Sequence, residues 1–378
     1  MYISLRKKDA LMMVVNGSLV DLSSPSSLTY FWNFGSLLGV FLMIQIVSGL
    51  FLSFHFTGDM SLSFNSVIHM MRDVDWGWLL RVIHANGASM FFMLMYFHMG
   101  RGMYFGSYRF SKVWLSGVSI LLLSMATAFL GYVLPWGQMS FWAATVITNL
   151  LSAMPYVGGM MVEWVWGGYA VGNPTLTRFF AFHFILPFVI SLFVVIHLLF
   201  LHEMGSNNPL GVSSNEDKIM FHPYYSIKDI FGLMIFFVGF MGICFLFPYM
   251  FMDVENFIFS NPLVTPIHIQ PEWYFLFAYA ILRSVPSKIG GVIALIMSVV
   301  IFYFFPMFLK HRFRSTIYYN IMKYMFWLYV INWVLLTWIG ACVVEMPYTI
   351  LGIHFSVLYF MMYLVFWFMY ESQDLMML

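Results

Sequence analysis

Four histidines have the spacing expected of ligands for two metal centres stacked along a pair of helices. His84 and His98 lie 14 residues apart in one apolar stretch, and His183 and His197 lie 14 residues apart in another. Fourteen residues of α-helix span about 21 Å with an angular drift of only about 40°, so each pair shares one helix face. On two helices that run in the same direction, His84 is level with His183, and His98 with His197. Two facing imidazoles at each of two depths can hold one metal ion each.

The ligand set favours haem iron over zinc. A single intramembrane histidine is often only a buried polar residue satisfied by a neighbour, but an identical spacing on two parallel helices argues against that interpretation. Zinc sites need three or four protein ligands, and neither level offers a cysteine or carboxylate beside its two histidines. A porphyrin supplies four ligands and leaves two axial positions for imidazoles. The sequence has no CxxCH motif, so we expect two non-covalent haem groups of the b type.

Four glycines repeat the register of the histidines. Gly35 and Gly49 lie 14 residues apart in one apolar stretch, and Gly117 and Gly131 lie 14 residues apart in another. Glycine is common at helix contacts in membranes, but this matched register predicts that the glycines let a flat porphyrin edge approach at the two histidine depths. Four polar or aromatic residues lie at span ends where haem propionates would emerge: Arg81, Arg101, Ser107 and Trp114.

The composition places these residues in a polytopic membrane protein. Of 378 residues, 62% are hydrophobic and 9% charged, and the net charge is +1. A typical soluble domain has about 25% charged residues, so a soluble protein of this size is excluded. The aromatic content of 21% excludes a disordered chain, and the low charge gives no basis for binding nucleic acid. Cys244 and Cys342 lie in apolar stretches and form no recognisable motif.

Apolar stretches of about 20 residues predict an all-α integral membrane protein with eight transmembrane helices. Across the resulting connections, twelve Lys and Arg residues fall on the side that carries both termini and five on the other, which agrees with the positive-inside rule. We call the basic side the N side and the other the P side. The predicted spans are Asn33–Phe54, 76–101, 113–134, Phe179–His202, Ile230–Phe247, Ile289–Leu309, Tyr324–Val344 and Met346–Tyr370.

Three regions follow from these spans. Residues 1–32 form an N-terminal segment on the N side. Residues 33–210 hold the first four spans, which we expect to form a di-haem four-helix bundle, with interfacial helices near 138–171 and one of them at Phe141–Ala153. Residues 211–378 hold the last four spans and a long P-side loop that contains the sequence PEWY. Long ordered loops on one side indicate a functional site there.

Five motifs resemble cytochrome b of the respiratory bc1 complex (complex III), and the resemblance covers nearly the whole chain. They are RVIHANGASMFF (Arg81–Phe92), GYVLPWGQMSFWAATVITN (Gly131–Asn149), HLLFLHEMGSNNP (His197–Pro209), HPYYSIKDI (His222–Ile230) and PEWYFLFAYAILRS (Pro271–Ser284). Eight spans on a single chain are similar to the mitochondrial type. The resemblance implies a ubiquinol–cytochrome c oxidoreductase subunit in the mitochondrial inner membrane, with both termini in the matrix. Its implied partners are a Rieske iron–sulfur protein, cytochrome c1, other complex III subunits and a second copy in a homodimer.

The resemblance also implies roles for individual residues. His84 and His183 would ligate the low-potential haem, and His98 and His197 the high-potential one. Ubiquinol would be oxidised in a P-side pocket, where Glu272 lies among apolar and aromatic neighbours that should raise its pKa and suit it to accept a proton. A carboxylate that only caps the loop is the alternative. Tyr132 and Tyr279 would hydrogen-bond near the quinol ring. The remaining residues implied to line this pocket are Met125, Phe129, Ala143, Ile147, Pro271, Phe275 and Leu295.

Four polar residues just beyond span ends are implied to serve a second, N-side pocket where ubiquinone is reduced. His202 and Asp229 can deliver the protons that a reduced quinone needs, and Ser206 and Lys228 lie close to them in the sequence. Without the resemblance, ordinary polar residues at a membrane interface would be the preferred interpretation.

One position departs from the family pattern. The family usually has glycine after the tryptophan of the P-side interfacial helix, whereas this chain reads Phe141-Trp142-Ala143-Ala144. The extra methyl group of Ala143 is expected to narrow a pocket wall and weaken the binding of bulky inhibitors.

Two other functional classes remain open from the residues alone. A transporter predicts an inverted repeat with broken helices, and a di-haem anchor of another dehydrogenase would lack the PEWY loop.

Overall fold

The computed structural model describes residues 5–377, which form a helical bundle with eight helices long and apolar enough to cross a membrane. This number confirms the prediction. The bounds of the eight are Tyr30–Ser53 (a 3₁₀ turn, Tyr30–Asn33, followed by α2, Phe34–Ser53), α4 (Gly77–Tyr104), α5 (Ser111–Val133), α8 (Asn173–Met204), α9 (Phe221–Leu246), Lys288–Phe308 (α11, Lys288–Val300, a 3₁₀ turn, Ile301–Phe304, and α12, Phe305–Phe308), α13 (Asn320–Ala341) and α14 (Tyr348–Met376).

Several helices are longer than the apolar stretches that predict them. The α8 helix begins at Asn173, six residues before the predicted start at Phe179, and Pro174 stands in its first turn. Proline suits this position because its missing N–H has no partner in the first turn of a helix. The helix ends before Gly205, whose φ of +77° is a left-handed value that favours glycine. Helical hydrogen bonding therefore continues through the polar flanks, where hydropathy no longer marks it.

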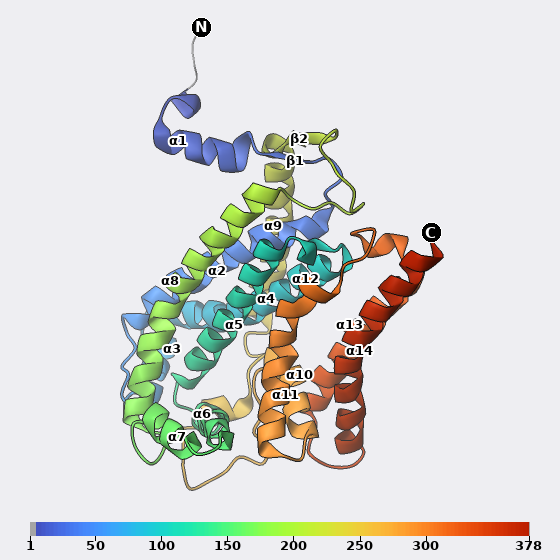
Figure 1. Cartoon of the computed structure of the whole chain (residues 1–378). Helices are drawn as coiled ribbons and strands as arrows, with labels where there is room; N and C mark the ends of the chain where they lie inside the picture. Colours follow the sequence, from blue (N-terminus) through green and yellow to red (C-terminus); the bar gives the residue numbers. More distant parts are fainter. Residues whose placement is uncertain (1–4, 378) are drawn as a thin grey trace.

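The first four spans form the predicted four-helix bundle as two closely packed pairs. The α2 helix packs along α4, and α5 packs along α8, whereas contacts between the two pairs are few. This arrangement leaves the space between the pairs to be lined by side chains from both. The other spans lie beside the bundle, with α9 against α2 and α4, and with α13 packed on α14 (Figure 1). The short helix α10 (Leu276–Ser284) joins α11 to this second pair.

Short helices cover the P side of the bundle (Figure 1). The predicted interfacial helix at Phe141–Ala153 is present as α6 (Gln138–Asn149) and a 3₁₀ turn (Leu150–Ala153), followed by α7 (Gly158–Trp166). Two further helices, α3 (Ser63–Arg72) and α10 (Leu276–Ser284), do not follow from the sequence patterns. The α10 helix packs closely on α13 at Gly340, whose missing side chain permits the approach. A Cβ added at Gly340 would lie only 2.2 Å from the Leu276 carbonyl oxygen.

The N side holds the only strand pair within the described residues. Strands β1 (Ser23–Pro25) and β2 (Lys218–Met220) pair antiparallel, with Ser23 opposite Met220. They tie the N-terminal segment, which includes α1 (Ala10–Val15), to the start of α9. Such short strands lack the alternating pattern that a longer strand would show, so the sequence does not predict them.

A buried polar cluster also lies on the N side. The Tyr108 hydroxyl lies 2.6 Å from His311 Nε2, and the imidazole stacks on the Tyr370 ring at 3.8 Å between centroids. His311 is 3% exposed, and its Nδ1 has no hydrogen-bond partner. Burial, together with the nearby Arg109 guanidinium, lowers the pKa of His311 to about 4. The cluster therefore holds a neutral imidazole between the connection after α4, the connection before α13 and the end of α14.

Candidate functional site

The structure brings His84 on α4 and His183 on α8 together across the gap between the two helix pairs. Their ring centroids are 6.2 Å apart. An imidazole nitrogen binds a transition metal at about 2.0 Å and lies about 1.1 Å from its ring centroid, so two imidazoles on opposite sides of one metal ion have centroids about 6.2 Å apart. The spacing therefore suits one metal ion between the rings.

A second pair, His98 on α4 and His197 on α8, lies at the other depth with ring centroids 6.4 Å apart. This spacing suits a metal ion for the same reason. The placement of all four rings follows the register predicted from the 14-residue spacing, and metal ligation by them stays a prediction. Within residues 5–377 no group of three or more His, Cys, Asp or Glu lies together, so a metal ion at either level must bring its other ligands with it.

Each of the four glycines faces one histidine ring. A Cβ added at Gly131 would lie 2.3 Å from His183 Cε1, and one at Gly49 would lie 3.0 Å from His84 Cε1. At the other depth, the corresponding distances to Cε1 are 3.3 Å from Gly117 to His197 and 3.4 Å from Gly35 to His98. The depths agree with the prediction. What lies against each glycine, however, is the edge of an imidazole, so the missing side chain makes room for the ring itself.

The Nδ1 atoms of three histidines have hydrogen-bond partners on the helix beside them. His183 Nδ1 lies 2.8 Å from the Thr127 carbonyl oxygen, which can only accept. Ser48 Oγ lies 2.9 Å from His84 Nδ1, and Ser116 Oγ lies 2.9 Å from His197 Nδ1. A proton held on Nδ1 leaves Nε2 with a free lone pair for a metal. These partners do not follow from the histidine spacing, although each serine directly precedes a glycine of the predicted register.

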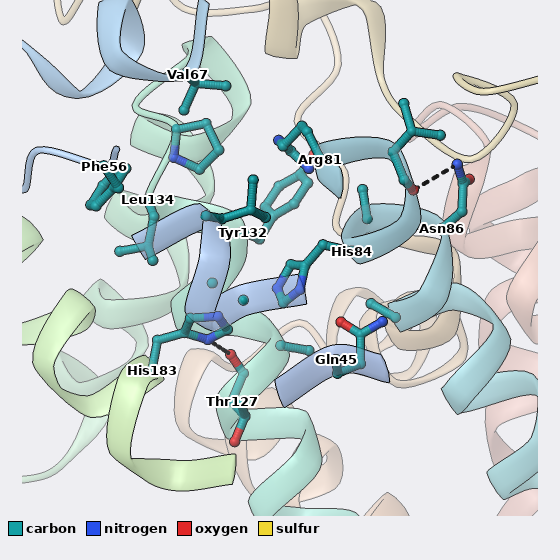
Figure 2. A pocket seen from close by; sticks show the side chains of 18 of the residues that line it. Gln45, Phe56, Val67, Arg81, His84, Asn86, Thr127, Tyr132, Leu134 and His183 are labelled. Atoms are coloured by element: carbon teal, nitrogen blue, oxygen red, sulfur yellow. Dashed lines mark hydrogen bonds between the residues drawn. The ribbon is translucent and has the colours of Figure 1, made fainter. Parts of the chain in front are cut away.

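A cavity of about 610 Å³ surrounds the P-side histidine pair. Figure 2 shows His84 and His183 from two helices, with Arg81 and Tyr132 beside them and Gln45 below. Gly49 and Gly131 line the same cavity, and so does Glu272. The PEWY loop therefore reaches the cavity that holds the histidine pair, and a cavity of this size is in the range of cofactor sites.

Glu272 and Tyr132 are brought together with Arg81 at the P-side end of this cavity. Burial raises the pKa of Glu272 to about 8; the Arg81 charge opposes the shift and Asp253 adds to it. The direction agrees with the expectation from its apolar neighbours. The Tyr132 hydroxyl accepts a hydrogen bond of 2.8 Å from Asn256 Nδ2, a residue that sequence analysis did not single out. A carboxyl group that is largely neutral at pH 7 thus lines the cavity that also holds the histidine pair.

The other residues implied for the quinol pocket do not line this cavity. Phe129 packs in a small cluster with Val133 and Trp136, while the Tyr279 hydroxyl donates to the Ile269 carbonyl oxygen at 3.0 Å. Ala143 is buried in α6 with 4% of its surface exposed. Those that lie outside the cavity are Met125, Phe129, Ala143, Ile147, Pro271, Phe275, Tyr279 and Leu295. They belong to α5, α6, α10, α11 and the loop before α10, and their role in binding quinol stays a prediction.

The residues expected near the N-side propionates differ in what they can offer. Arg101 Nη2 lies 3.1 Å from His98 Nδ1, and Arg101 Nε is buried without a partner. The Trp114 indole N–H already donates to the Phe302 carbonyl oxygen at 2.6 Å. Ser107 Oγ lies 3.2 Å from Asn207 Nδ2, which donates to it. Of these residues, Arg101 therefore has unused donors beside the histidine pair, whereas the Trp114 donor is taken.

The N-side quinone residues lie near the start of α9 and the end of α8. Lys228 Nζ donates to the Leu28 carbonyl oxygen at 2.6 Å, and the half-buried Asp229 lies close to Ser36. His202 is exposed, and Ser206 is half-buried. Lys228 thus lies against the N-terminal segment and Asp229 near α2, and within the described part of the chain neither forms a hydrogen bond with His202.

Comparison with known proteins agrees with this architecture. Residues 19–205 match the family model described as "Cytochrome b/b6/petB", and residues 259–360 match "Cytochrome b(C-terminal)/b6/petD". A solved chain described as "Hyperthermophilic respiratory Complex III" superposes with a TM-score of 0.90 at 30% identity, over 97% of this chain and 98% of that chain. The chain belongs to the cytochrome b family. Membership in this family implies that the chain binds haem b.

The residues present fit haem. The four glycines leave room for the four imidazoles. The centroid distances of 6.2 and 6.4 Å within the two histidine pairs suit an iron between the two rings of each pair. The unpartnered Arg101 Nε offers a donor to a carboxylate. Because a guanidinium only donates, His98 Nδ1 accepts from Arg101 in this arrangement, and ligation through His98 Nε2 requires Arg101 to turn toward another acceptor, such as a propionate.

Proposed function

We propose that the chain is the cytochrome b subunit of a ubiquinol–cytochrome c oxidoreductase and binds two haem b groups without covalent bonds. The observation that carries the proposal is the pair of histidine couples, His84 with His183 and His98 with His197, with ring centroids 6.2 and 6.4 Å apart. The two couples lie about 21 Å apart along the helices, which is most of a hydrocarbon core of about 30 Å. When bound, the haems supply one-electron carriers at two depths of the membrane.

The residues on the P side support the acceptance of protons from a quinol. A carboxyl group with a pKa of about 8 ionises in part near neutral pH, and the resulting carboxylate of Glu272 can take a proton from a quinol hydroxyl. Tyr132 lines the same cavity and offers a hydroxyl beside it. Arg81 at that end of the cavity can bind a propionate, because guanidinium and carboxylate groups form strong hydrogen bonds.

The residues on the N side would serve quinone reduction. We assign proton delivery to His202 and Asp229, and contacts with the quinone head group to Ser206 and Lys228. The half-buried position of Asp229 beside Ser36 supports a role for it. An electron that moves from the P side to the N side works against a P-positive membrane potential, which costs about 2.3 kcal/mol per 100 mV. Proton release on P and uptake on N would then store redox energy as a proton-motive force.

The partners and the location follow from the same proposal. We propose assembly with a Rieske iron–sulfur protein, cytochrome c1 and a second copy of the chain. The match to a solved complex III chain over nearly its whole length supports membership in a multi-subunit complex. We place the protein in the mitochondrial inner membrane with both termini in the matrix. The distribution of twelve Lys and Arg residues on the N side against five on the P side supports that orientation.

The haem content of the purified complex tests the proposal. We expect a reduced-minus-oxidised spectrum with two b-type haems per chain, whereas a transporter would contain none. His183→Ala should remove the P-side haem and abolish quinol oxidation. His354→Ala is the matched control, because His354 is exposed on α14 and its Nδ1 contacts only the Ile350 carbonyl oxygen of its own helix. A colourless wild-type complex, or a His183→Ala complex with both haems, contradicts the proposal.

A further inference from the structure

At each of the two depths of the bundle, one serine contacts one histidine. Ser48 Oγ lies 2.9 Å from His84 Nδ1, and Ser116 Oγ lies 2.9 Å from His197 Nδ1. Both serines are buried, with 3% and 8% of their surface exposed. Ser48 directly precedes Gly49, and Ser116 directly precedes Gly117, so the helix that leaves room for the ring also presents a hydroxyl to its edge.

The direction of these hydrogen bonds follows from the other partners of the hydroxyls. The Ser48 hydroxyl donates to the Ile44 carbonyl oxygen at 2.6 Å, and the Ser116 hydroxyl donates to the Val113 carbonyl oxygen at 2.9 Å. A hydroxyl has one proton and two lone pairs. Each serine oxygen therefore accepts from the Nδ1–H of its histidine, which fixes the proton on Nδ1 and leaves the Nε2 lone pair free.

The other two histidines lack such a contact. His183 Nδ1 donates to the Thr127 carbonyl oxygen at 2.8 Å, and His98 Nδ1 lies beside Arg101 Nη2 at 3.1 Å. One histidine in each couple is thus held by a serine hydroxyl and the other is not. A serine–histidine hydrogen bond of this kind therefore occurs once at each depth. The serine lies on α2 for the P-side couple and on α5 for the N-side couple.

We propose that Ser48 and Ser116 are positioning residues that set the tautomer and donor strength of His84 and His197, and through them the midpoint potential of the metal centre at each depth. A hydrogen bond accepted from Nδ1–H makes the imidazole a stronger electron donor at Nε2. A stronger donor stabilises oxidised iron more than reduced iron and therefore lowers the potential. The inference rests on the proposed haem ligation and assigns each serine to one haem.

Redox titration of each haem in the assembled complex tests this assignment. We expect Ser48→Ala to raise the midpoint potential of the P-side haem alone, and Ser116→Ala to raise that of the N-side haem alone. A threefold change in the ratio of oxidised to reduced iron is the expected size, which is about 28 mV at 59 mV per tenfold change for one electron. Ser48→Thr and Ser116→Thr keep the hydroxyl and should restore the wild-type potentials.

A matched control lies on the same helix as Ser116. Ser119→Ala removes a hydroxyl that contacts the Leu115 carbonyl oxygen and the Tyr303 hydroxyl but no histidine, so both potentials should stay unchanged. If Ser48→Ala does not assemble, Ser48→Cys is titrated with the same expectation, because a thiol is a weak acceptor of similar size.

The outcomes separate the inference from the proposed function. The role of the serines is overturned if both alanine variants keep two haems with unshifted midpoint potentials. It is also overturned if each variant shifts the potentials of both haems equally. In either case the proposed haem ligation stands. A wild-type complex without haem overturns the proposed function itself. Shifts confined to one haem in each variant, reversed by threonine, support the serine assignment.

Discussion

Substitution of Gly131 by alanine should displace the P-side haem while the helices stay intact. The added Cβ would lie 2.3 Å from His183 Cε1, 2.8 Å from Nδ1 and 2.9 Å from Nε2. Carbon atoms in contact prefer about 3.5–4.0 Å, so the ring or its helix must move by more than 1 Å. Ligand sites tolerate errors of about 0.5 Å. Alanine favours a helix over glycine by about 0.5–1 kcal/mol, so loss of the haem cannot be attributed to a weakened helix.

The other three glycines give a graded series on the same scaffold. The added Cβ would lie 3.0 Å from a histidine ring atom at Gly49, 3.3 Å at Gly117 and 3.4 Å at Gly35. Shifts of a few tenths of an ångström relieve the last two. We therefore expect the retained haem at the affected level to rise in the order Gly131→Ala, Gly49→Ala, Gly117→Ala, Gly35→Ala, with Gly35→Ala close to the wild type.

The assay is the haem content per complex, taken from reduced-minus-oxidised spectra after purification, with subunit content as the control for assembly. Gly131→Ala should keep the N-side haem and lose most of the P-side haem. Full occupancy of both haems in Gly131→Ala would refute the reasoning. Equal losses in Gly131→Ala and Gly35→Ala would also refute it, because the two differ by 1.1 Å in the space that they offer.

Three further predictions concern other residues. Burial raises the pKa of Glu272 to about 8, so quinol oxidation should speed up as the pH rises through about 8 and the carboxylate forms; Glu272→Gln should be slower and lose this rise, and an unchanged profile would contradict the assignment. The pKa of His311 is lowered from 6.5 to about 4. The neutral imidazole therefore makes its full contribution to the free energy of unfolding above about pH 6.5. That free energy falls by up to about 3 kcal/mol as the pH is lowered toward 4. Between these pH values the Tm of the wild type should therefore fall further than the Tm of His311→Gln. Parallel curves of Tm against pH for the two forms would contradict this role of His311. Ala143→Gly should increase sensitivity to bulky P-side inhibitors by about tenfold or more, because one methyl group in a pocket is worth about 1–3 kcal/mol; equal inhibition of both forms would defeat this idea.

Much of the fold could be predicted because membrane spans obey simple rules. A hydrocarbon core leaves no partner for backbone groups outside a helix, so each long apolar stretch had to be helical. The fixed rise and rotation of the helix then determined that His84 and His98, like His183 and His197, share a face. The depth of the four glycines followed from the same arithmetic, and each proved to lie against one histidine.

Short and irregular parts could not be predicted in this way. The α3 and α10 helices lie in loops with no long apolar stretch, and the β1–β2 pair joins segments nearly 200 residues apart. The Trp114 indole N–H was expected near a propionate, yet it donates to Phe302, which lies 188 residues away. Contacts of this kind depend on which helices become neighbours, and hydropathy and spacing carry no such information.

The sequence by itself determined that the chain crosses a membrane eight times and that four of its histidines, His84, His98, His183 and His197, stand at two depths, because helix geometry and the cost of burying polar groups leave little choice. Only the tertiary structure decided that His84 meets His183 at 6.2 Å, that Ser48 and Ser116 hold two of the rings, and that Glu272 reaches the P-side cavity. These contacts join residues from different helices and loops. Their distances depend on how the two helix pairs pack, which is a property of the whole bundle rather than of any one segment.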